Sequence, residues 1–517
     1  MSDWSAGYVS ELGYTYGYYE ELSTGRVDFC LLNKGLRPPN ISHALELGFG
    51  QGVSINIHAA ASDVTWTGTD FNPSQANFAR QLAGQSGTNA LLHDASFQEF
   101  LANDETPEFQ FIGLHGIWSW ISDANRQAIV DIIRTKLAVG GVVYMSYNTL
   151  PGWAGFAPMR HLMTQHAKVL GSAGEGIINR IDDAFDFSRR LFELNPKYLP
   201  ANPQAVARMN KLKEQNRHYL AHEFFNEDWH PMHFSSVAAL LEEAKLEFAA
   251  PATYSDHVDE IHFTAEQRQF LREIPDATLR ETTRDFILNQ QFRKDYWIKG
   301  PVRLAPLERA IGLRGVKVVL KIPASKITFK MTGGLGEISF NETVYRPIID
   351  FLSDHKIRAI GEIEDHFAIS DTTSRPKISL AQITQAIVLL LGTNQVTLAQ
   401  DDAVASAVKN RSAALNKFLL DKAKFSNDVG YLASPITGGG INANRFEMLF
   451  LHAIAEGATE PKLWAESAWR VLSSQGHRLV NQGVTLESDQ ENLDELSSKA
   501  GEFAEKRLST FRTLGIV

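Results

Sequence analysis

Residues 46–52 read Glu-Leu-Gly-Phe-Gly-Gln-Gly, and this stretch decides the fold class. A short apolar run over residues 41–45 precedes it, and an apolar, helix-like run over residues 53–61 follows it. A strand, a tight glycine turn and a helix form the unit that holds a nucleotide-like cofactor, because glycines permit unusual backbone angles and close approach to a ligand. The stretch therefore predicts an α/β nucleotide-binding domain.

The spacing of the glycines separates two classes of cofactor. A dinucleotide turn has the pattern Gly-x-Gly-x-x-Gly, whereas a turn for S-adenosylmethionine (SAM) has an acidic residue followed by glycines at every second position. Here Glu46 stands two residues before Gly48, and Gly50 and Gly52 follow at steps of two. This spacing favours SAM. A tight strand-to-helix turn without a ligand is the alternative.

Two aspartates continue the pattern: Asp70 stands 24 residues after Glu46, and Asp94 stands 24 residues after Asp70. Asp70 follows a plausible second strand, where its carboxylate can accept both ribose hydroxyls. Asp94 ends a plausible third strand and could accept from an adenine amino group, with Phe97 over the ring face. Alternatively, Asp94 is only the cap of a helix over residues 97–101.

The composition is that of a globular protein of two to four domains, with 517 residues, 44% hydrophobic and 21% charged. Residues 1–300 contain 25 Lys and Arg against 36 Asp and Glu, and residues 301–517 contain 25 against 24. Neither part has the basic excess of a DNA-tracking surface, so a nucleic-acid partner is not expected.

The single cysteine, Cys30, excludes an internal disulfide framework and fits a reducing compartment. The first residues lack the basic and apolar regions of a secretory signal, and no apolar run approaches the ~20 residues of a spanning helix. These features predict a cytoplasmic protein.

Strands alternate with helices over residues 41–147, which predicts a parallel sheet with ligands at the carboxyl ends of its strands. The expected strands are 43–48, 65–70, 90–94, 109–114 and 141–147, and the expected helices include 74–83 and 123–138.

The remaining segments divide the chain further. The aromatic-rich residues 1–40, with the run Tyr14 to Tyr19, are expected to fold over the mouth of the cofactor site, or to serve only as a packing arm. Helices broken by prolines over residues 155–220 predict an inserted cap. We expect residues 220–256 to complete the sheet, residues 262–300 to be helical, and Gly300-Pro301 to be a linker.

Residues 301–517 predict a winged-helix-like α+β domain. The expected strands are 318–322 and 327–330, with a wing strand at 395–398; the expected helices are 343–353, 380–391 and 444–456, with a charged terminal helix at 487–505. The domain limits are thus 1–40 (lid), 41–154 (SAM-binding core), 155–220 (cap), 221–300 (end of the core and regulatory region) and 301–517.

Methyl transfer needs an acceptor held in line near ~3 Å and able to lose a proton, so reacting groups should lie at the ends of strands four and five. After strand four, His115 is a candidate base or a contact to the methionine part of SAM. Trp118 and Trp120 could wall a channel for a cation. A structural histidine and core tryptophans, the latter favoured for Trp120, are the alternatives.

After strand five, Tyr147 and Asn148 can orient an amine by hydrogen bonds. Neither is a strong base, so water would take the proton; a tyrosine-capped turn is the alternative. His222 and Glu223 are structural or substrate-facing. The spacing of His230 and His233 without cysteines is no zinc signature, so we expect no metal.

Taken together, these residues resemble the class I SAM-dependent methyltransferases with a methyltransferase regulatory domain, a bacterial group that includes protein-lysine methyltransferases of outer-membrane proteins. The matching motifs are Tyr16-Gly17, residues 46–52, His115-Gly116 with Ser119-Trp120, Ser146-Tyr147-Asn148 with Pro151-Gly152-Trp153, residues 219–225, and Phe292-Arg293 with Asp295. They cover about residues 10–300.

The resemblance implies a Rossmann-like seven-stranded domain with SAM as cofactor. The implied cofactor contacts are Glu46, Gly48, Gly50, Gly52, Asp70 and Asp94, to which we add Phe71, Ala95 and His115. The implied acceptor side comprises Tyr16, His115, Trp118, Tyr147, Asn148 and Trp153, to which we add His222 and Glu223. We therefore expect methylation of a protein side-chain amine, and a homodimer is among the expected states. The alternatives are a small-molecule or glycolipid methyltransferase, and a nucleic-acid- or protein-binding regulator with a vestigial SAM fold.

Overall fold

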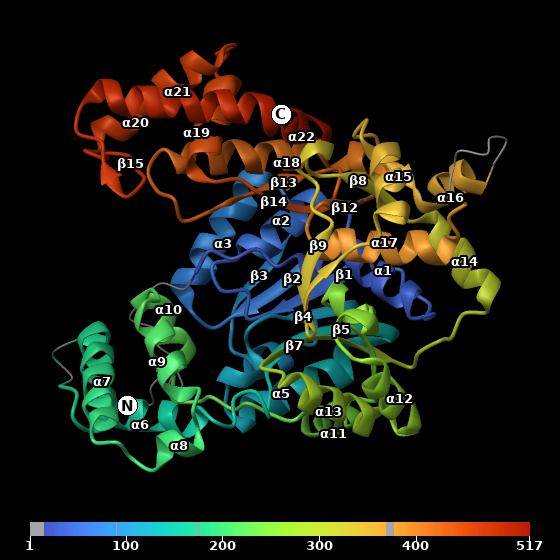
Figure 1. Cartoon of the computed structure of the whole chain (residues 1–517), viewed down its shortest axis with the longest axis vertical. Coiled ribbons are helices and arrows are strands. Elements are labelled where there is room, and N and C mark those ends of the chain that lie inside the picture. Colours follow the sequence, from blue (N-terminus) through green and yellow to red (C-terminus); the bar gives the residue numbers. More distant parts are fainter. Residues whose placement is uncertain (1–14, 89, 173, 175, 369–376) are drawn as a thin grey trace.

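The computed structural model describes residues 15–88, 90–172, 174, 176–368 and 377–517. Its centre is a seven-stranded sheet in the order β3-β2-β1-β4-β5-β7-β6 (Figure 1). The strands are β1 His43–Leu47, β2 Thr65–Asp70, β3 Leu91–Asp94, β4 Phe109–Leu114, β5 Leu137–Asn148, β6 Leu246–Pro251 and β7 Phe292–Lys299. The first five are parallel, and β7 runs antiparallel to both β5 and β6.

The five parallel strands expected from the sequence are confirmed, with β5 beginning at Leu137. The expectation of helix throughout residues 262–300 is wrong at its end, because residues 292–299 form β7. The expectation that residues 220–256 complete the sheet is correct for β6, which lies within them, and wrong for β7, which lies outside. Strand β7 carries buried aromatic residues such as Tyr296 and Trp297 and pairs on both edges, so tertiary pairing overrides the helical pattern before it.

Two helical layers cover the sheet. Helices α1 (Thr24–Asn33), α2 (Val53–Ala61) and α3 (Pro73–Ser86) share a hydrophobic core on one face. Helices α4 (Phe97–Leu101), α5 (Asp123–Lys136) and α11 (Phe234–Glu242) pack on the other. This is the α/β architecture that the glycine turn predicts.

Two insertions interrupt the domain. The first comprises α6 Ala157–Val169, α7 Gly176–Glu193, α8 Tyr198–Ala201, α9 Ala205–Lys213 and α10 Arg217–Phe224. It has a small core of its own, which includes Met163, Ile181 and Leu220, and it matches the expected helical cap. The second, between β6 and β7, contains α12 (Ala265–Glu273) and α13 (Ala277–Leu288).

The C-terminal part is α+β. Its helices are α14 Pro306–Gly315, α15 Glu342–Leu352, α16 Ile360–Ala368, α17 Leu380–Gly392, α18 Asp402–Ala423, α19 Arg445–Ala455, α20 Pro461–Ser474, α21 Asp489–Lys506 and α22 Leu508–Thr513. Its strands are β8 Lys317–Leu320, β9 Lys330–Gly333, β10 Gly336–Ser339, β11 Arg358–Ala359, β12 Val396–Ala399, β13 Tyr431–Ser434, β14 Gly439–Asn442, β15 Val480–Asn481 and β16 Val484–Thr485.

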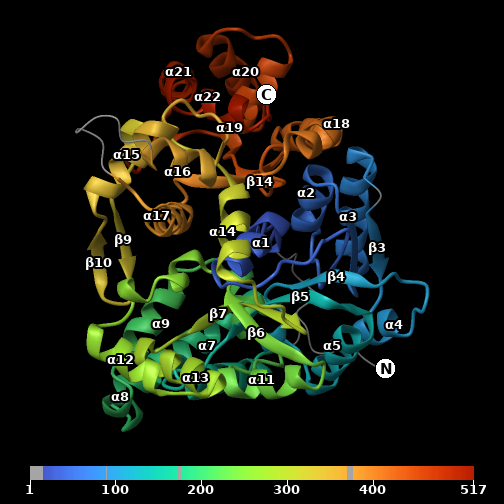
Figure 2. The same cartoon turned by 90° about the vertical axis from the view of Figure 1, so that its right-hand side faces the viewer.

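Most expected C-terminal elements are present, but the strand expected at residues 327–330 begins only at Lys330. Strands β11, β8 and β12 form one small sheet, and the winged-helix description stays a prediction. In both views, helices α18–α22 lie at one end of the molecule and the inserted helices α6–α9 toward the other (Figure 2).

The C-terminal part packs directly on helix α2 of the sheet domain. Every residue of α2 is buried, because its outer side shares a core with α18 and α19. The last carbonyls of this region also find partners there: Ser412 Oγ donates to Ala60, Gln400 Nε2 to Ala61, and Arg411 Nη2 to Ser62. The unusually apolar α2 is therefore explained by burial on all sides. No helix in the described ranges is long and apolar enough to cross a membrane.

Candidate cofactor and acceptor site

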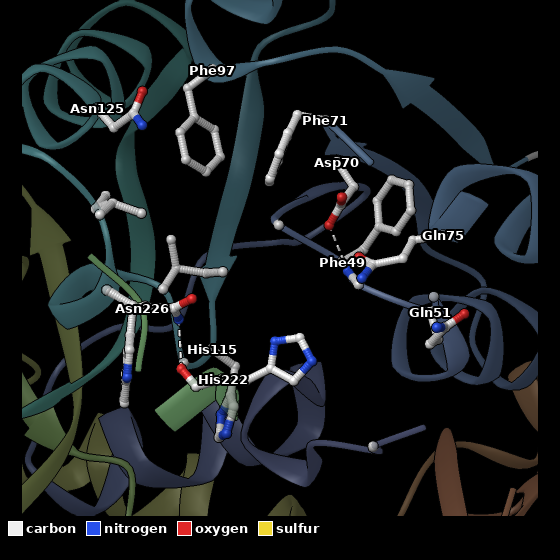
Figure 3. Close-up of a pocket in the computed structure, with 18 of the residues that line it drawn as sticks. Phe49, Gln51, Asp70, Phe71, Gln75, Phe97, His115, Asn125, His222 and Asn226 are labelled. Atoms are coloured by element: carbon white, nitrogen blue, oxygen red, sulfur yellow. Dashed lines mark hydrogen bonds between the residues drawn. The ribbon is translucent and has the colours of Figure 1, made fainter. Parts of the chain in front are cut away.

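A cavity opens where the carboxyl ends of β1, β2, β3 and β4 meet the inserted helix α10 (Figure 3). Its floor is the glycine turn. Gly48, Gly50 and Gly52 have positive φ angles of 71°, 57° and 69°. A Cβ on Gly52 would lie 2.3 Å from the Ala79 Cβ, and one on Gly48 would lie 2.5 Å from the Ile117 Cδ1. All three positions thus need glycine, as the turn pattern predicts.

Asp70 closes the turn from the end of β2. Its Oδ2 accepts from the Gly50 N–H at 2.8 Å and its Oδ1 from the Asn72 N–H at 2.9 Å. Burial raises the pKa of this carboxyl to about 6, although both hydrogen bonds favour the charged form. The carboxylate lines the cavity and keeps lone pairs for hydroxyl donors.

Glu46 lies beneath the turn and outside the cavity lining. Its Oε2 is buried without a hydrogen-bond partner in the part of the chain that the structure describes. Burial and the neighbouring Asp70 raise its pKa well above the ordinary value. In this state the side chain shapes the turn and makes no direct contact with the cavity.

At the far end of the cavity, Phe71 and Phe97 line one side, with Asp70 next to Phe71 (Figure 3). Ala95 lines the cavity beside them, but Asp94 does not and is exposed. The cap of α4 is Ser96 rather than Asp94, since Ser96 Oγ accepts from the Glu99 N–H. The structure therefore brings Phe71 and Ala95 to the site and leaves Asp94 at its edge.

His115 forms the wall below the end of β4. Its ring is stacked on Tyr19 with centroids 3.6 Å apart, and its Nδ1 lies 2.8 Å from the Tyr144 hydroxyl. Burial lowers the pKa of His115 to about 4, despite the nearby Glu21. A neutral imidazole with so low a pKa is a weak base, so its position suits shape and hydrogen bonding.

The inserted helix α10 supplies the opposite wall. His222 and Glu223 line the cavity, followed one turn later by Asn226, whose Nδ2 donates to the His222 carbonyl (Figure 3). Burial raises the pKa of the Glu223 carboxyl to about 7. Asp228 lines the same wall. The wall thus faces the cavity with two acidic side chains.

The two tryptophans after β4 exchange their expected places. Trp118 is fully buried in the core beneath the sheet and does not line the cavity. Trp120 does line it, and its Nε1 donates to the Glu223 carbonyl at 3.2 Å. Both lie in a short 3-10 helix, whose three residues per turn point them apart.

Tyr147 and Asn148 are also outside the cavity lining. Tyr147 is fully buried, and its hydroxyl donates to Asp295 Oδ2 at 2.8 Å. The Asn148 N–H donates to Ser119 Oγ at 2.8 Å. Strand β7, which the sequence pattern missed, covers this end of β5 and takes both residues away from the site.

Trp153 and Tyr16 likewise contact other groups. Trp153 lies in an aromatic cluster with Phe224 and Trp229, and its Nε1 donates to the Gln291 carbonyl. The Tyr16 ring packs on Phe78 of α3 with centroids 5.3 Å apart. Neither lines the cavity.

The roof of the cavity is residues 15–19, and sequence reasoning missed how it alternates. Thr15, Gly17 and Tyr19 line the cavity, whereas Tyr16 and Tyr18 contact α3 and the C-terminal part. A period of two is the signature of an extended segment with two different faces. The lid expectation for residues 1–14, which includes Tyr14, lies outside the described residues.

Behind the Tyr19–His115 pair lies a second cavity of about 610 Å³, bordered by the C-terminal part. Tyr19 and His115 line both cavities. Over the described ranges, no group of three or more His, Cys, Asp or Glu side chains is arranged to hold a metal ion.

Comparison with known proteins places this geometry in a family. Residues 216–299 match the family described as a predicted methyltransferase regulatory domain. This segment includes α10 with Glu223 and strands β6 and β7, so it completes the sheet and walls the cavity. The chain is 40% identical to the uncharacterized protein sll1526 of Synechocystis over 99% of both chains.

Among solved structures, the chain resembles PKMT2 of Rickettsia typhi in complex with AdoHcy, with a TM-score of 0.69 and 17% identity over 97% of this chain and 99% of that one. A second PKMT2 structure gives a TM-score of 0.65. At such identity the likeness shows a shared fold, and it extends through the C-terminal part. The chain therefore belongs to one family with sll1526, contains a segment that matches the predicted methyltransferase regulatory domain, and shares the fold of PKMT2.

Proposed function

We propose that this protein binds SAM in the first cavity and transfers its methyl group to a protein side-chain amine, of the lysine type. The observation that carries the proposal is one cavity with the Gly50–Asp70 turn on one wall and the Glu223 carboxyl on the other. The first wall suits a nucleoside, and the second suits a cationic acceptor.

The residues present fit the cofactor. The left-handed glycines leave the backbone of the turn open to a ligand, and Asp70 keeps acceptor capacity for ribose hydroxyls. Phe71 and Phe97 offer aromatic faces for a flat base. When bound, SAM supplies a sulfonium methyl group that a neutral amine can attack.

The acceptor wall selects for charge. An ammonium group entering beside α10 meets the carboxyls of Glu223 and Asp228 and the face of Trp120, each of which attracts a cation. A carboxyl whose pKa is raised to about 7 is well matched to accept a proton near neutral pH. We therefore assign Glu223 as the proton acceptor that leaves the amine uncharged, and Trp120 and Asp228 as groups that orient it.

We further propose that the acceptor is a protein, since the chain resembles bacterial protein-lysine methyltransferases in its motifs, and that the reaction occurs in the cytoplasm. A homodimer and the domain limits of the sequence analysis belong to the same proposal, with residues 155–220 and 301–517 framing the acceptor. Small molecules and glycolipids are the competing acceptors.

Two measurements test this function. Calorimetric titration of the purified protein with AdoHcy should give micromolar or tighter binding. Incubation of a cell extract with the protein and methyl-labelled SAM should then label protein bands, and mass spectrometry should find the methyl groups on lysine. Label confined to the organic or small-solute fraction would move the proposal to those acceptors. A folded protein that fails to bind AdoHcy would overturn it.

A further inference from the structure

The hairpin of β13 and β14, in the C-terminal part, forms a seat for one residue of the cavity roof. A Cβ on Gly440 would lie 3.0 Å from three ring carbons of Tyr18, and one on Gly439 would lie 2.2 Å from the Tyr18 hydroxyl. The Gly440 backbone also hydrogen-bonds to Tyr18. Tyr431, on the paired strand, lies with its ring centroid 5.4 Å from that of Tyr18. Only glycines leave room for a tyrosine this close to the hairpin.

His58 gives the hairpin a second connection to the roof. This fully buried residue of α2 donates from Nε2 to the Tyr19 carbonyl at 3.0 Å. The ring also lies against the hairpin, since a Cβ on Gly439 would be 3.9 Å from the His58 Cε1. Its ring centroid lies 5.0 Å from that of Tyr18. The hairpin therefore reaches both Tyr18 and, through His58, its neighbour Tyr19.

Tyr19 itself separates two hollow spaces. Its ring lines both the first cavity and the second cavity of about 610 Å³. Its backbone is tied at the N–H, which donates to Ser54 Oγ at 3.2 Å, and at the carbonyl by His58. The backbone contacts of Tyr19, its stacking on His115 and the contacts of its neighbour Tyr18 therefore all bear on the position of the roof.

We propose that the β13–β14 hairpin is a positioning element for cofactor binding: Gly439 and Gly440 hold Tyr18, and Tyr18 holds Tyr19 over the cofactor cavity and against His115. This inference rests on the proposed function. It gives the C-terminal part a defined task, which is to set the affinity for the cofactor by fixing the roof. A movement of the hairpin changes that affinity, and cofactor binding in turn orders the hairpin, since coupling between two sites is reciprocal.

The test compares two glycines of this region. Gly440→Ala pushes a methyl group into the Tyr18 ring, whereas Gly430→Ala is the matched control, because a Cβ there has no neighbour closer than 3.8 Å. We expect Gly440→Ala to weaken AdoHcy binding about fivefold or more, the lower end of ordinary site-to-site coupling, and Gly430→Ala to stay within about twofold of the parent. Hydrogen exchange of the amides of residues 15–22, without ligand, should become faster only in Gly440→Ala.

A double variant separates positioning from general damage. Tyr18→Ala removes atoms instead of adding them, so it remains informative if Gly440→Ala folds poorly. Both substitutions break the same contact, so the double variant should bind AdoHcy no more weakly than Tyr18→Ala alone. The inference would be overturned if the losses of AdoHcy affinity in the two single variants multiplied in the double variant. It would also be overturned if the Gly440→Ala protein bound AdoHcy as the parent does. If the parent itself does not bind AdoHcy, the proposed function fails. The rate of amide hydrogen exchange in residues 15–22 then shows by itself whether the hairpin holds the roof in place.

Discussion

The rings of Tyr19 and His115 are stacked 3.6 Å apart and together form the wall between the cofactor cavity and the second cavity. Tyr19 comes from the N-terminal segment and His115 from the end of β4.

Removal of the Tyr19 ring should weaken cofactor binding. Tyr19→Ala opens this wall to the polar second cavity and should weaken AdoHcy binding about tenfold, as expected for the loss of an aromatic contact of about 0.5–1.5 kcal/mol together with burial. Tyr19→Phe keeps the ring and should bind within about threefold of the parent. Equal losses in both variants would assign the effect to the hydroxyl instead of the stacked ring.

Asp70 and Asp94 were both expected to contact the cofactor, and the structure separates them. Asp70→Ala should raise the AdoHcy Kd by about 10-fold to 100-fold, the range for losing a hydrogen bond to a charged group, because Asp70 also holds the Gly50 N–H. Asp94→Ala is the control, since Asp94 is exposed and outside the cavity lining. Calorimetric titration of both variants measures the difference. A large loss for Asp94→Ala would restore its adenine role.

Glu223 should impose a pH dependence on turnover. Burial raises its pKa to about 7, so the carboxylate that accepts the proton is present above pH 7 and is lost as the pH falls below it. The turnover rate should therefore fall about tenfold per pH unit below pH 7. Glu223→Gln should lose this limb and about 10²–10⁴ of the rate, with little change in AdoHcy affinity. An unchanged pH profile in Glu223→Gln would assign the proton acceptor elsewhere.

Asp28 should lower the stability of the protein at alkaline pH. Burial raises the pKa of this carboxyl to about 7, and its Oδ1 has no hydrogen-bond partner among the described residues. The unfolded chain has the ordinary aspartate pKa of about 3.9. Because the folded-state pKa is higher, the contribution of Asp28 to stability is fully present below pH ~3.9 and is lost as the pH rises through 7. Asp28→Asn should raise the free energy of unfolding by about 2 kcal/mol at pH 8, with little change at pH 4. Urea unfolding at both values tests this, with the exposed Asp63→Asn as control.

Tyr147 should act through stability. Its hydroxyl donates to the buried Asp295, which also accepts from Arg293 Nε at 2.7 Å. Tyr147→Phe leaves part of this carboxylate without a donor and should cost about 1–3 kcal/mol of unfolding free energy. AdoHcy affinity should stay unchanged. A loss of turnover without loss of stability would instead support the acceptor role expected from its position after β5.

Local sequence was sufficient wherever a short pattern meets a single structural requirement. The glycine turn and the apolar runs of β1 to β5 lie where expected, since each depends on neighbours within a few residues. The strand at residues 292–299 was not predicted, because its strand character comes from pairing with β5 and β6. Helix α18 was not predicted, since its buried side faces α2, more than 300 positions earlier in the chain.

The candidate site divides in the same way. Asp70, Phe71, Ala95 and His115 could be placed from their positions directly after strands, where parallel topology gathers ligands. The inserted helix α10 could not be docked from sequence, so Asn226 and Asp228 were missed, although they follow His222 and Glu223 by about one turn each. Both Trp118 and Trp120 were offered as channel walls, with core packing favoured for Trp120; the structure reverses that preference, because a 3-10 helix turns side chains differently from a strand end.

The sequence by itself determined the class of the fold and the kind of cofactor that the glycine turn suits. A glycine turn after a strand has few alternative structures. Only the tertiary structure decided which side chains face the cavity. Packing of distant segments buries Tyr147 beside β7, brings Glu223 and Asp70 to the same cavity, and places Tyr18 against the C-terminal hairpin. These contacts join residues far apart in the chain, and no local periodicity encodes them.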